Sequence, residues 1–162
     1  MEVTGNHPAC RADKESALTS NATLKQLFRI SDVAGLIVLT PDQKTNSDKS
    51  RYVTFQNDIS VSDSGREFIM RPRTLEEAFV YDNFGHYRDE KFKLGITIPT
   101  DLNEAYDAIY ERIKSNSFKK TDFAMNVLAS KEAWQVPAYI VEGLKWLELR
   151  LHPTLTPAAT EQ

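Results

Sequence analysis

The sequence has a single cysteine, Cys10, and no long apolar run. One cysteine cannot form an internal disulfide or the knuckle of a metal site, so a reducing cytoplasm is the expected location. Because no run of about 18 apolar residues occurs, we predict no transmembrane helix. The first residues lack a basic segment followed by an apolar stretch, which argues against a secretory signal peptide.

The chain also lacks an excess of basic residues. Its net charge is -3 and its sequence pI is about 5.6, whereas proteins that neutralise nucleic-acid phosphates are usually basic. Any contact with nucleic acid then needs a local basic patch, or carboxylates that act through bound cations. The 162 residues, 41% of them hydrophobic, suffice for one domain with its own core.

Common catalytic signatures are missing as well. There is no Gly-rich phosphate loop, CxxC, HExxH or GxSxG motif, each of which marks a defined chemistry. The three histidines, His7, His86 and His152, are not paired at ligand spacing. The chemistry of single motifs therefore does not specify a reaction.

Local patterns predict a few strands in the first half and helices in the second. Residues 1–22 are expected to be coil, and 84–93 and the polar stretch 57–65 to be loops. The expected regular elements are a helix at 21–30, a strand-length apolar run at 33–40, strands at 51–56, 66–70 and 94–98, and helices at 100–116, 121–131 and 136–152. The fold class is thus α/β with a predominantly helical C-terminal half.

Apolar residues recur at helical spacing in these segments. In a helix at 74–81, Leu75, Ala78 and Phe79 are predicted to point inward, and in the next helix Leu102, Ala105, Ile109 and Ile113 lie along one face. The apolar positions of the third are Phe123, Val127 and Leu128, and in the last Ile140, Leu144, Leu147 and Leu151 recur at alternating four- and three-residue steps. Thr100 or Asp101 is the expected cap of the helix at 100–116.

The stretch "RPRTLEEAFVYDNF" admits two interpretations. Thr74 followed by Glu77 is a capping box, and acids in a first turn complement the helix dipole, so Glu76 and Glu77 are explained by an ordinary capped helix. Alternatively, Arg71 and Arg73 follow the end of a strand, where ligands of open α/β sheets bind. A carboxylate there can hold a divalent cation and an arginine a phosphate.

Two further stretches are open to a functional interpretation. "SFKKTDFA", residues 117–124, is a basic turn before a helix, or it carries a lysine placed to neutralise phosphate charge during phosphodiester cleavage. "DLNE", from Asp101 to Glu104, is similar to the acid pair of a toprim metal site. Asn103 replaces the second acid, however, and helix capping accounts for Asp101.

Four segments, in order, resemble the C-terminal toprim domain of OLD-family ATP-dependent endonucleases. They are "CRADKESALTSNATLK", "RYVTFQ", "RPRTLEEAFVYDN", and "KKTDFAMNVL" with the following "WQVPAYIVEGLKWL". The resemblance covers about residues 10–147. It implies a partial toprim nuclease domain over residues 1–152, followed by a disordered tail at 153–162, and a role in phage defence or DNA processing.

The resemblance also implies roles for individual residues. Glu76, or its neighbour Glu77, would join the acidic cluster that holds Mg²⁺ or Mn²⁺, and Lys120 would stabilise the transition state, with Lys119 as the alternative. Arg73 would orient the glutamate or contact a phosphate. Two residues of the "TSN" turn, Ser20 and Asn21, would lie near the site. DNA is the implied substrate.

The chain departs from the family pattern at the acids. It contains no Asp-x-Asp, and the resemblance begins after the position of the family's acidic strands and ATPase domain. We therefore expect a part of a nuclease that is inactive alone and acts with an ATPase-bearing chain or by self-association. A non-enzymatic binding module and an unrelated small α/β domain are the alternatives. The last predicts that Glu76, Arg73 and Lys120 do not converge.

Overall fold

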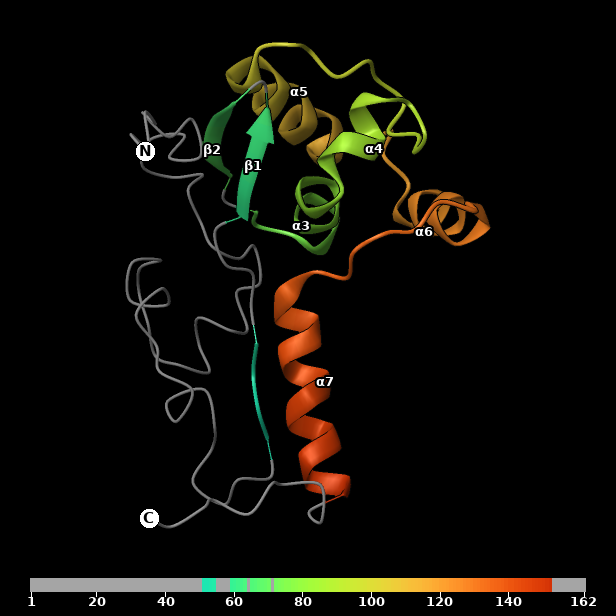
Figure 1. The fold of residues 1–162 in the computed structure, drawn as a ribbon. Coiled ribbons are helices and arrows are strands. Elements are labelled where there is room, and N and C mark those ends of the chain that lie inside the picture. Colours follow the sequence, from blue (N-terminus) through green and yellow to red (C-terminus); the bar gives the residue numbers. More distant parts are fainter. Residues whose placement is uncertain (1–50, 55–58, 64, 71, 153–162) are drawn as a thin grey trace.

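The structure is a computed structural model, and it describes residues 51–54, 59–63, 65–70 and 72–152. Strands β1 (Ile59–Asp63) and β2 (Arg66–Met70) precede helices α3 (Leu75–Asp82), α4 (Phe84–Arg88), α5 (Leu102–Lys114), α6 (Lys120–Ala129) and α7 (Ala138–Leu151). The class is thus a mixture of helices with a small sheet, and the second half is helical as predicted (Figure 1).

Strands β1 and β2 form an antiparallel hairpin in which Ile59 pairs with Met70 and Val61 with Phe68. These four side chains belong to the core cluster or pack against it. Gly65 in the connecting turn has a φ of 78°, a conformation that glycine adopts without strain. The strand at 66–70 is confirmed, whereas the loop predicted at 57–65 is wrong for 59–63. There, alternating serines hid a period-two strand.

Helix α3 is buried almost all round, and α4 follows it directly. Residues from Glu76 to Tyr81 are buried, but Leu75 is 46% exposed, so its predicted inward position is wrong. The loop predicted at 84–93 contains the short helix α4. Its Phe84 and Tyr87, three residues apart, are both buried against the core.

Helix α5 matches its prediction closely. Leu102, Ala105, Ile109 and Ile113 are all buried. Asp101 caps the helix by accepting hydrogen bonds from the backbone N–H groups of Asn103 and Glu104. The strand predicted at 94–98 is wrong, since this segment pairs with no strand among the described residues. Leu94 and Ile98 are still buried, so the alternating pattern reflected burial and not a hydrogen-bonded ladder.

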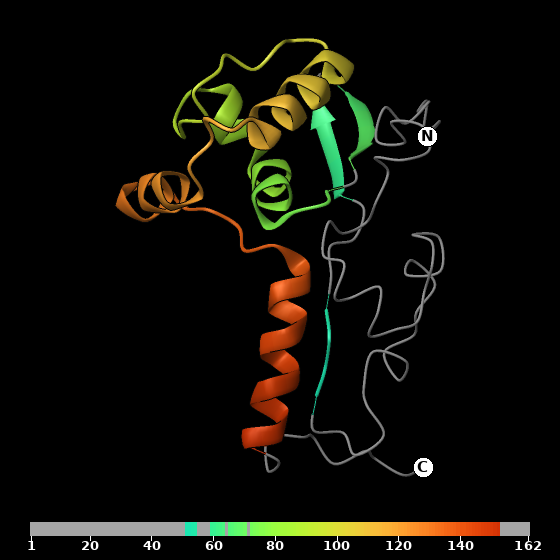
Figure 2. The ribbon, with the colours of Figure 1, turned by 180° about the vertical axis from the view of Figure 1, so that it is seen from behind.

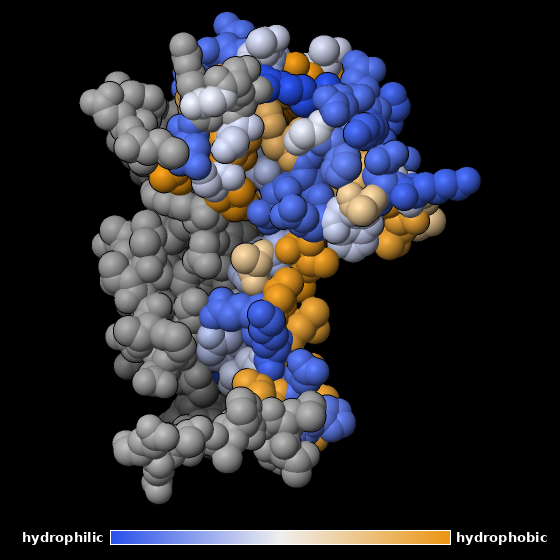
Figure 3. All heavy atoms as spheres, in the orientation of Figure 1, coloured by the Kyte–Doolittle hydropathy of each residue, from blue (hydrophilic) through white to orange (hydrophobic). Residues whose placement is uncertain are grey.

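Helices α6 and α7 leave the compact part of the chain in different directions (Figures 1 and 2). Phe123 and Val127 are the buried residues of α6, whereas Leu128, the third predicted apolar position, is 69% exposed. No residue of α7 is buried. Its predicted apolar positions Leu144, Leu147 and Leu151 are exposed, and apolar surface follows α7 in Figure 3.

One side of α7 contacts residues 51–54. The rings of Tyr52 and Trp146 stack with centroids 5.4 Å apart, and the Tyr52 hydroxyl donates a hydrogen bond to Glu142. Burial, then the hydrogen bond and charge of Glu142, raise the pKa of Tyr52 to about 12. Of the strand predicted at 51–56, the described part shows a single bridge residue at Tyr52.

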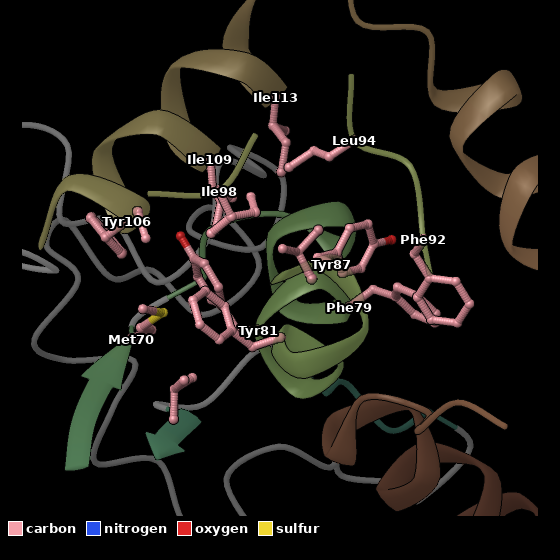
Figure 4. Packing of buried hydrophobic residues seen from close by; sticks show 14 of the residues in the cluster. Met70, Phe79, Tyr81, Tyr87, Phe92, Leu94, Ile98, Tyr106, Ile109 and Ile113 are labelled. Atoms are coloured by element: carbon pink, nitrogen blue, oxygen red, sulfur yellow. The ribbon is translucent and has the colours of Figure 1, made fainter. Parts of the chain in front are cut away.

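The core is built largely from aromatic rings of separate segments. Figure 4 shows Phe79 beside Tyr87 and Phe92, and Tyr81 near Tyr106 and Met70. Phe79 is its centre, with ring centroids 5.4 Å from Trp134, 5.8 Å from Phe123, 6.2 Å from Phe92 and 6.5 Å from Tyr87. A single side chain of α3 therefore joins α4, α6 and the segments that flank them.

Several predictions concern residues outside the described part. They are the coil at 1–22, the helix at 21–30, the apolar run at 33–40, the roles of Ser20, Asn21 and Arg71, and the tail at 153–162. Within the described residues, no helix combines the length and the apolar character that crossing a membrane requires.

Candidate functional site

The candidate site is a buried carboxylate that a lysine from another helix covers. Lys120 Nζ lies 3.1 Å from Glu76 Oε1 and 3.2 Å from Oε2. The Glu76 side chain is only 8% exposed, whereas that of Lys120 is 70% exposed. The lysine therefore approaches from the solvent side and remains accessible to a ligand while it neutralises the carboxylate.

An ion pair and an aromatic contact together hold α6 against α3 at this point. Glu76 and Phe79 are three residues apart on α3, as are Lys120 and Phe123 on α6, and side chains at that spacing share one helix face. The Phe79–Phe123 contact, at 5.8 Å and nearly perpendicular, is thus the apolar counterpart of the ion pair. It sets the helix separation at which Lys120 reaches Glu76.

The position of Lys120 on α6 is electrostatically unfavourable by itself. Lys120 is the first residue of the helix, where the positive end of the helix dipole disfavours a cation. Lys119 before it offers no side-chain hydrogen bond as a cap. The negative charge of Glu76 offsets this cost, so the pair is a tertiary feature and not a consequence of helix propensity.

Tyr139 is a third member of the site that sequence reasoning missed. It lies in the first turn of α7, two residues after Pro137. Burial, and then the negative charge of Glu76, raise the pKa of Tyr139 to about 12. Its hydroxyl therefore stays neutral and able to donate a hydrogen bond at neutral pH. The available signal was its place inside the "VPAYI" segment.

Arg73 and Glu77 form a separate pair. The Arg73 backbone N–H donates to Glu77 Oε2 at 2.6 Å and its Nη2 to Oε1 at 3.0 Å. The guanidinium also lies over the Tyr110 ring, 4.0 Å from the centroid. Burial lowers the pKa of Arg73, but the hydrogen bonds and charge of Glu77, with Tyr110, outweigh it and raise the pKa overall.

These contacts distinguish Glu76 from Glu77, which the sequence alone left as alternative site residues. Glu77 is 1% exposed and both its oxygens are occupied by Arg73, whereas Glu76 faces Lys120. Thr74 accepts the Glu77 N–H at 3.2 Å as a capping box requires, but the Glu77 side chain returns to the Arg73 N–H instead of that of Thr74. Arg73 contacts Glu77 and not Glu76.

The donor set for a divalent cation is incomplete in the described part of the chain. No group of three His, Cys, Asp or Glu side chains converges there, and Glu76 contributes one carboxylate whose partner is Lys120. Catalytic two-metal sites need several carboxylates to balance the charge of the ions. These residues by themselves therefore do not fit the Mg²⁺ or Mn²⁺ that the resemblance implies.

Asp82, at the end of α3, is a partly buried carboxyl with no role in this pair. Its Oδ2 atom has no hydrogen-bond partner, and burial raises its pKa above the usual 3.8. The folded state therefore holds the proton more tightly than the unfolded chain. The resulting penalty is absent below pH 3.8, grows as the pH rises towards the folded-state pKa, and is complete above it.

We expect Asp82→Asn to raise the thermal midpoint slightly at pH 7 and to leave it unchanged at pH 3, because only the ionised carboxylate is penalised. Circular dichroism melts at both pH values measure this. Asp89→Asn, at an exposed position, is the control and should show no gain that depends on pH. An equal gain for Asp82→Asn at both pH values would contradict the electrostatic cause.

Comparisons of the chain with family models, with curated proteins and with solved structures found no match. What the described residues define is a mixed helix-and-strand chain with a half-accessible lysine–glutamate pair. Its function is proposed below from this geometry and from the residue patterns described above.

Proposed function

We propose that this chain supplies the C-terminal part of an OLD-type toprim nuclease domain, in which Lys120 and Glu76 act at the scissile phosphate of DNA. The observation that supports the proposal is the convergence of these two residues, 44 positions apart, at 3.1 Å. The unrelated-domain alternative predicted that Glu76, Lys120 and Arg73 would point apart. Two of the three meet, while Arg73 is engaged with Glu77.

The chemistry assigned to the chain's own residues is electrostatic. The exposed ammonium of Lys120 would stabilise the negative charge that develops on the phosphate. Glu76 would hold that ammonium in place, and Tyr139, whose hydroxyl stays neutral, would supply a hydrogen-bond donor. The family's Mg²⁺ or Mn²⁺ would supply water activation, and with one carboxylate in place it requires acids from beyond the described residues.

The proposal includes a partner. We expect the chain alone to be inactive and to work with an ATPase-bearing chain that carries the missing acids, in the cytoplasm and in phage defence or DNA processing. Glu76 would then be the carboxylate that this chain contributes to a shared site. DNA contact would depend on local positive charge, since the chain has a net charge of -3.

Nicking of supercoiled plasmid with Mn²⁺ tests the proposal. The wild-type chain alone should leave the plasmid intact, and addition of the ATPase-bearing chain should produce nicks. Lys120→Ala should lower the nicking rate of the mixture by about 10²–10³-fold, the effect of losing one transition-state donor. Lys145→Ala, an exposed lysine of α7, should leave the rate unchanged.

Each other outcome has a definite meaning. Equal rates for Lys120→Ala and wild type would refute the assignment of Lys120. Nicking by the isolated chain that Lys120→Ala abolishes would show that the site is complete without a partner. The absence of nicking in every mixture would favour a non-enzymatic role.

A non-enzymatic interaction module is the second candidate, and one observation favours it. Large apolar side chains are exposed on α6, on α7 and between them, namely Met125, Leu128, Trp134, Val136, Leu144, Leu147, Leu149 and Leu151, and Figure 3 shows apolar surface along this part. Exposed apolar patches mark interaction sites. Sedimentation velocity that detects a complex in which Lys120→Ala has no effect would support this candidate.

A further inference from the structure

Three basic residues surround a pocket near the start of α6, next to the Glu76–Lys120 pair. A pocket of about 230 Å³ is lined by Lys93, Arg112 and Lys119, which come from three separate segments. Asp122 is the acid that lines it. This concentration of cations stands out in a chain whose net charge is -3.

Arg112 is held rigidly, and by neutral groups. Its Nε donates to the Leu94 carbonyl at 2.8 Å, and its Nη1 donates to the hydroxyls of Ser115 at 3.1 Å and Ser117 at 3.0 Å. Its guanidinium lies 5.4 Å from the centre of the Phe118 ring. Within the described residues these contacts include no carboxylate, so the charge of Arg112 is fixed in place and left without a counterion.

Gly95 packs closely against one edge of this guanidinium. A Cβ atom at Gly95 would lie 3.1 Å from Arg112 Nη2, closer than side chains normally approach. Gly95 also has a φ of 78°, so a larger residue would be strained there. Arg112 Nη2 therefore lies against Gly95, which also lines the pocket, and has no hydrogen bond to another described residue.

We propose that this pocket binds a phosphate group, with Arg112 as the fixed donor and Lys93 and Lys119 as the flanking cations. A guanidinium with free N–H groups matches the oxygens of phosphate. The pocket volume of about 230 Å³ is below the roughly 300–1,000 Å³ typical of pockets for drug-sized ligands, which favours a small anion. The ligand is thus a phosphate group, either free or as one phosphodiester of a nucleic-acid backbone.

The site differs from the Glu76–Lys120 pair and does not depend on nuclease activity. Neighbouring residues separate the two, since Lys119 lines the pocket while Lys120 contacts Glu76. Asp122 opposes anion binding, so its charge should weaken the affinity. Removal of the Asp122 carboxylate should therefore tighten phosphate binding. No such effect is expected if Arg112 only stabilises the fold.

Titration with inorganic phosphate at constant ionic strength, followed by amide chemical shifts in two-dimensional NMR, tests the proposal. We expect saturable shifts confined to residues around the pocket. Lys119→Ala and Lys93→Ala should each weaken binding about threefold to fivefold, the usual worth of an exposed charge. Asp122→Asn should strengthen it by a similar factor, and Lys145→Ala should leave it unchanged.

A second arm identifies the source of the phosphate. If a short oligothymidylate displaces inorganic phosphate and shifts the same amide signals, the pocket binds a nucleic-acid backbone. If phosphate binds but the oligothymidylate does not displace it, the pocket binds a free anion. The proposal is overturned if the shifts do not saturate, if they are spread over the surface, or if Asp122→Asn fails to tighten binding. Failure of plasmid nicking has no bearing on any of these results.

Discussion

Replacement of Phe79 by alanine is expected to lower the free energy of unfolding by about 3–5 kcal/mol, the usual cost of removing a large aromatic side chain from a core. Phe79 is 7% exposed, and four aromatic rings lie within 6.5 Å of its centroid. These rings come from α4, α6 and two connecting segments, so the cavity cannot close without moving them. Urea denaturation measures the loss.

The same substitution should also disturb the Glu76–Lys120 pair. Without the Phe79–Phe123 contact, the position of α6 depends on fewer apolar contacts, and Lys120 no longer has a fixed approach to Glu76. The control is Leu128→Ala on α6, at a 69% exposed position, which should change stability by less than about 0.5 kcal/mol. A loss below about 1 kcal/mol for Phe79→Ala would mean that this ring does not hold the helices together.

Replacement of Glu77 by glutamine is expected to destabilise the fold by about 3 kcal/mol, because it leaves Arg73 partly buried and without its counterion. The Glu77 side chain is 1% exposed and that of Arg73 15%, so water can replace the lost interaction only in part. The Arg73 N–H would also lose the negative charge of its acceptor. Chemical denaturation of the purified variant measures the effect.

A double-mutant cycle separates the pair from other consequences. Arg73→Gln with Glu77→Gln should cost less than the sum of the two single changes, since no unpaired charge remains, and we expect a coupling of about 1–3 kcal/mol. Glu132→Gln, at an exposed position, should be neutral. Additive single changes would show that Arg73 and Glu77 contribute independently, contrary to the geometry.

Local sequence was enough for α3, α5, α6 and α7, but not for α4, which lies in a segment predicted as a loop. In α5, four apolar residues at helical spacing and a capping aspartate lie within one segment, so nothing beyond that segment was needed to predict its bounds and buried face. The same holds for the capping of α3 by Thr74. Helix hydrogen bonds and caps join residues a few positions apart, so a sequence pattern of a few residues is enough to predict them.

Strands and burial required more than local pattern. Residues 94–98 alternate as a strand does, yet no described strand lies beside them, while 59–63 pair with β2 through Ile59 and Val61 despite a polar composition. The apolar stripe of α7 was predicted correctly as a pattern but faces no core. In each case the result depends on which segment lies opposite, which a single stretch of sequence does not contain.

The sequence by itself determined the approximate bounds of α5, α6 and α7, and that an acidic first turn follows a strand. Only the tertiary structure decided which glutamate meets the lysine. Glu76 and Glu77 are neighbours, so they point to different sides of α3. The Phe79–Phe123 contact brings α6 to the side of Glu76, and Arg73 occupies Glu77. That choice depends on packing between residues more than 40 positions apart, for which no local pattern exists.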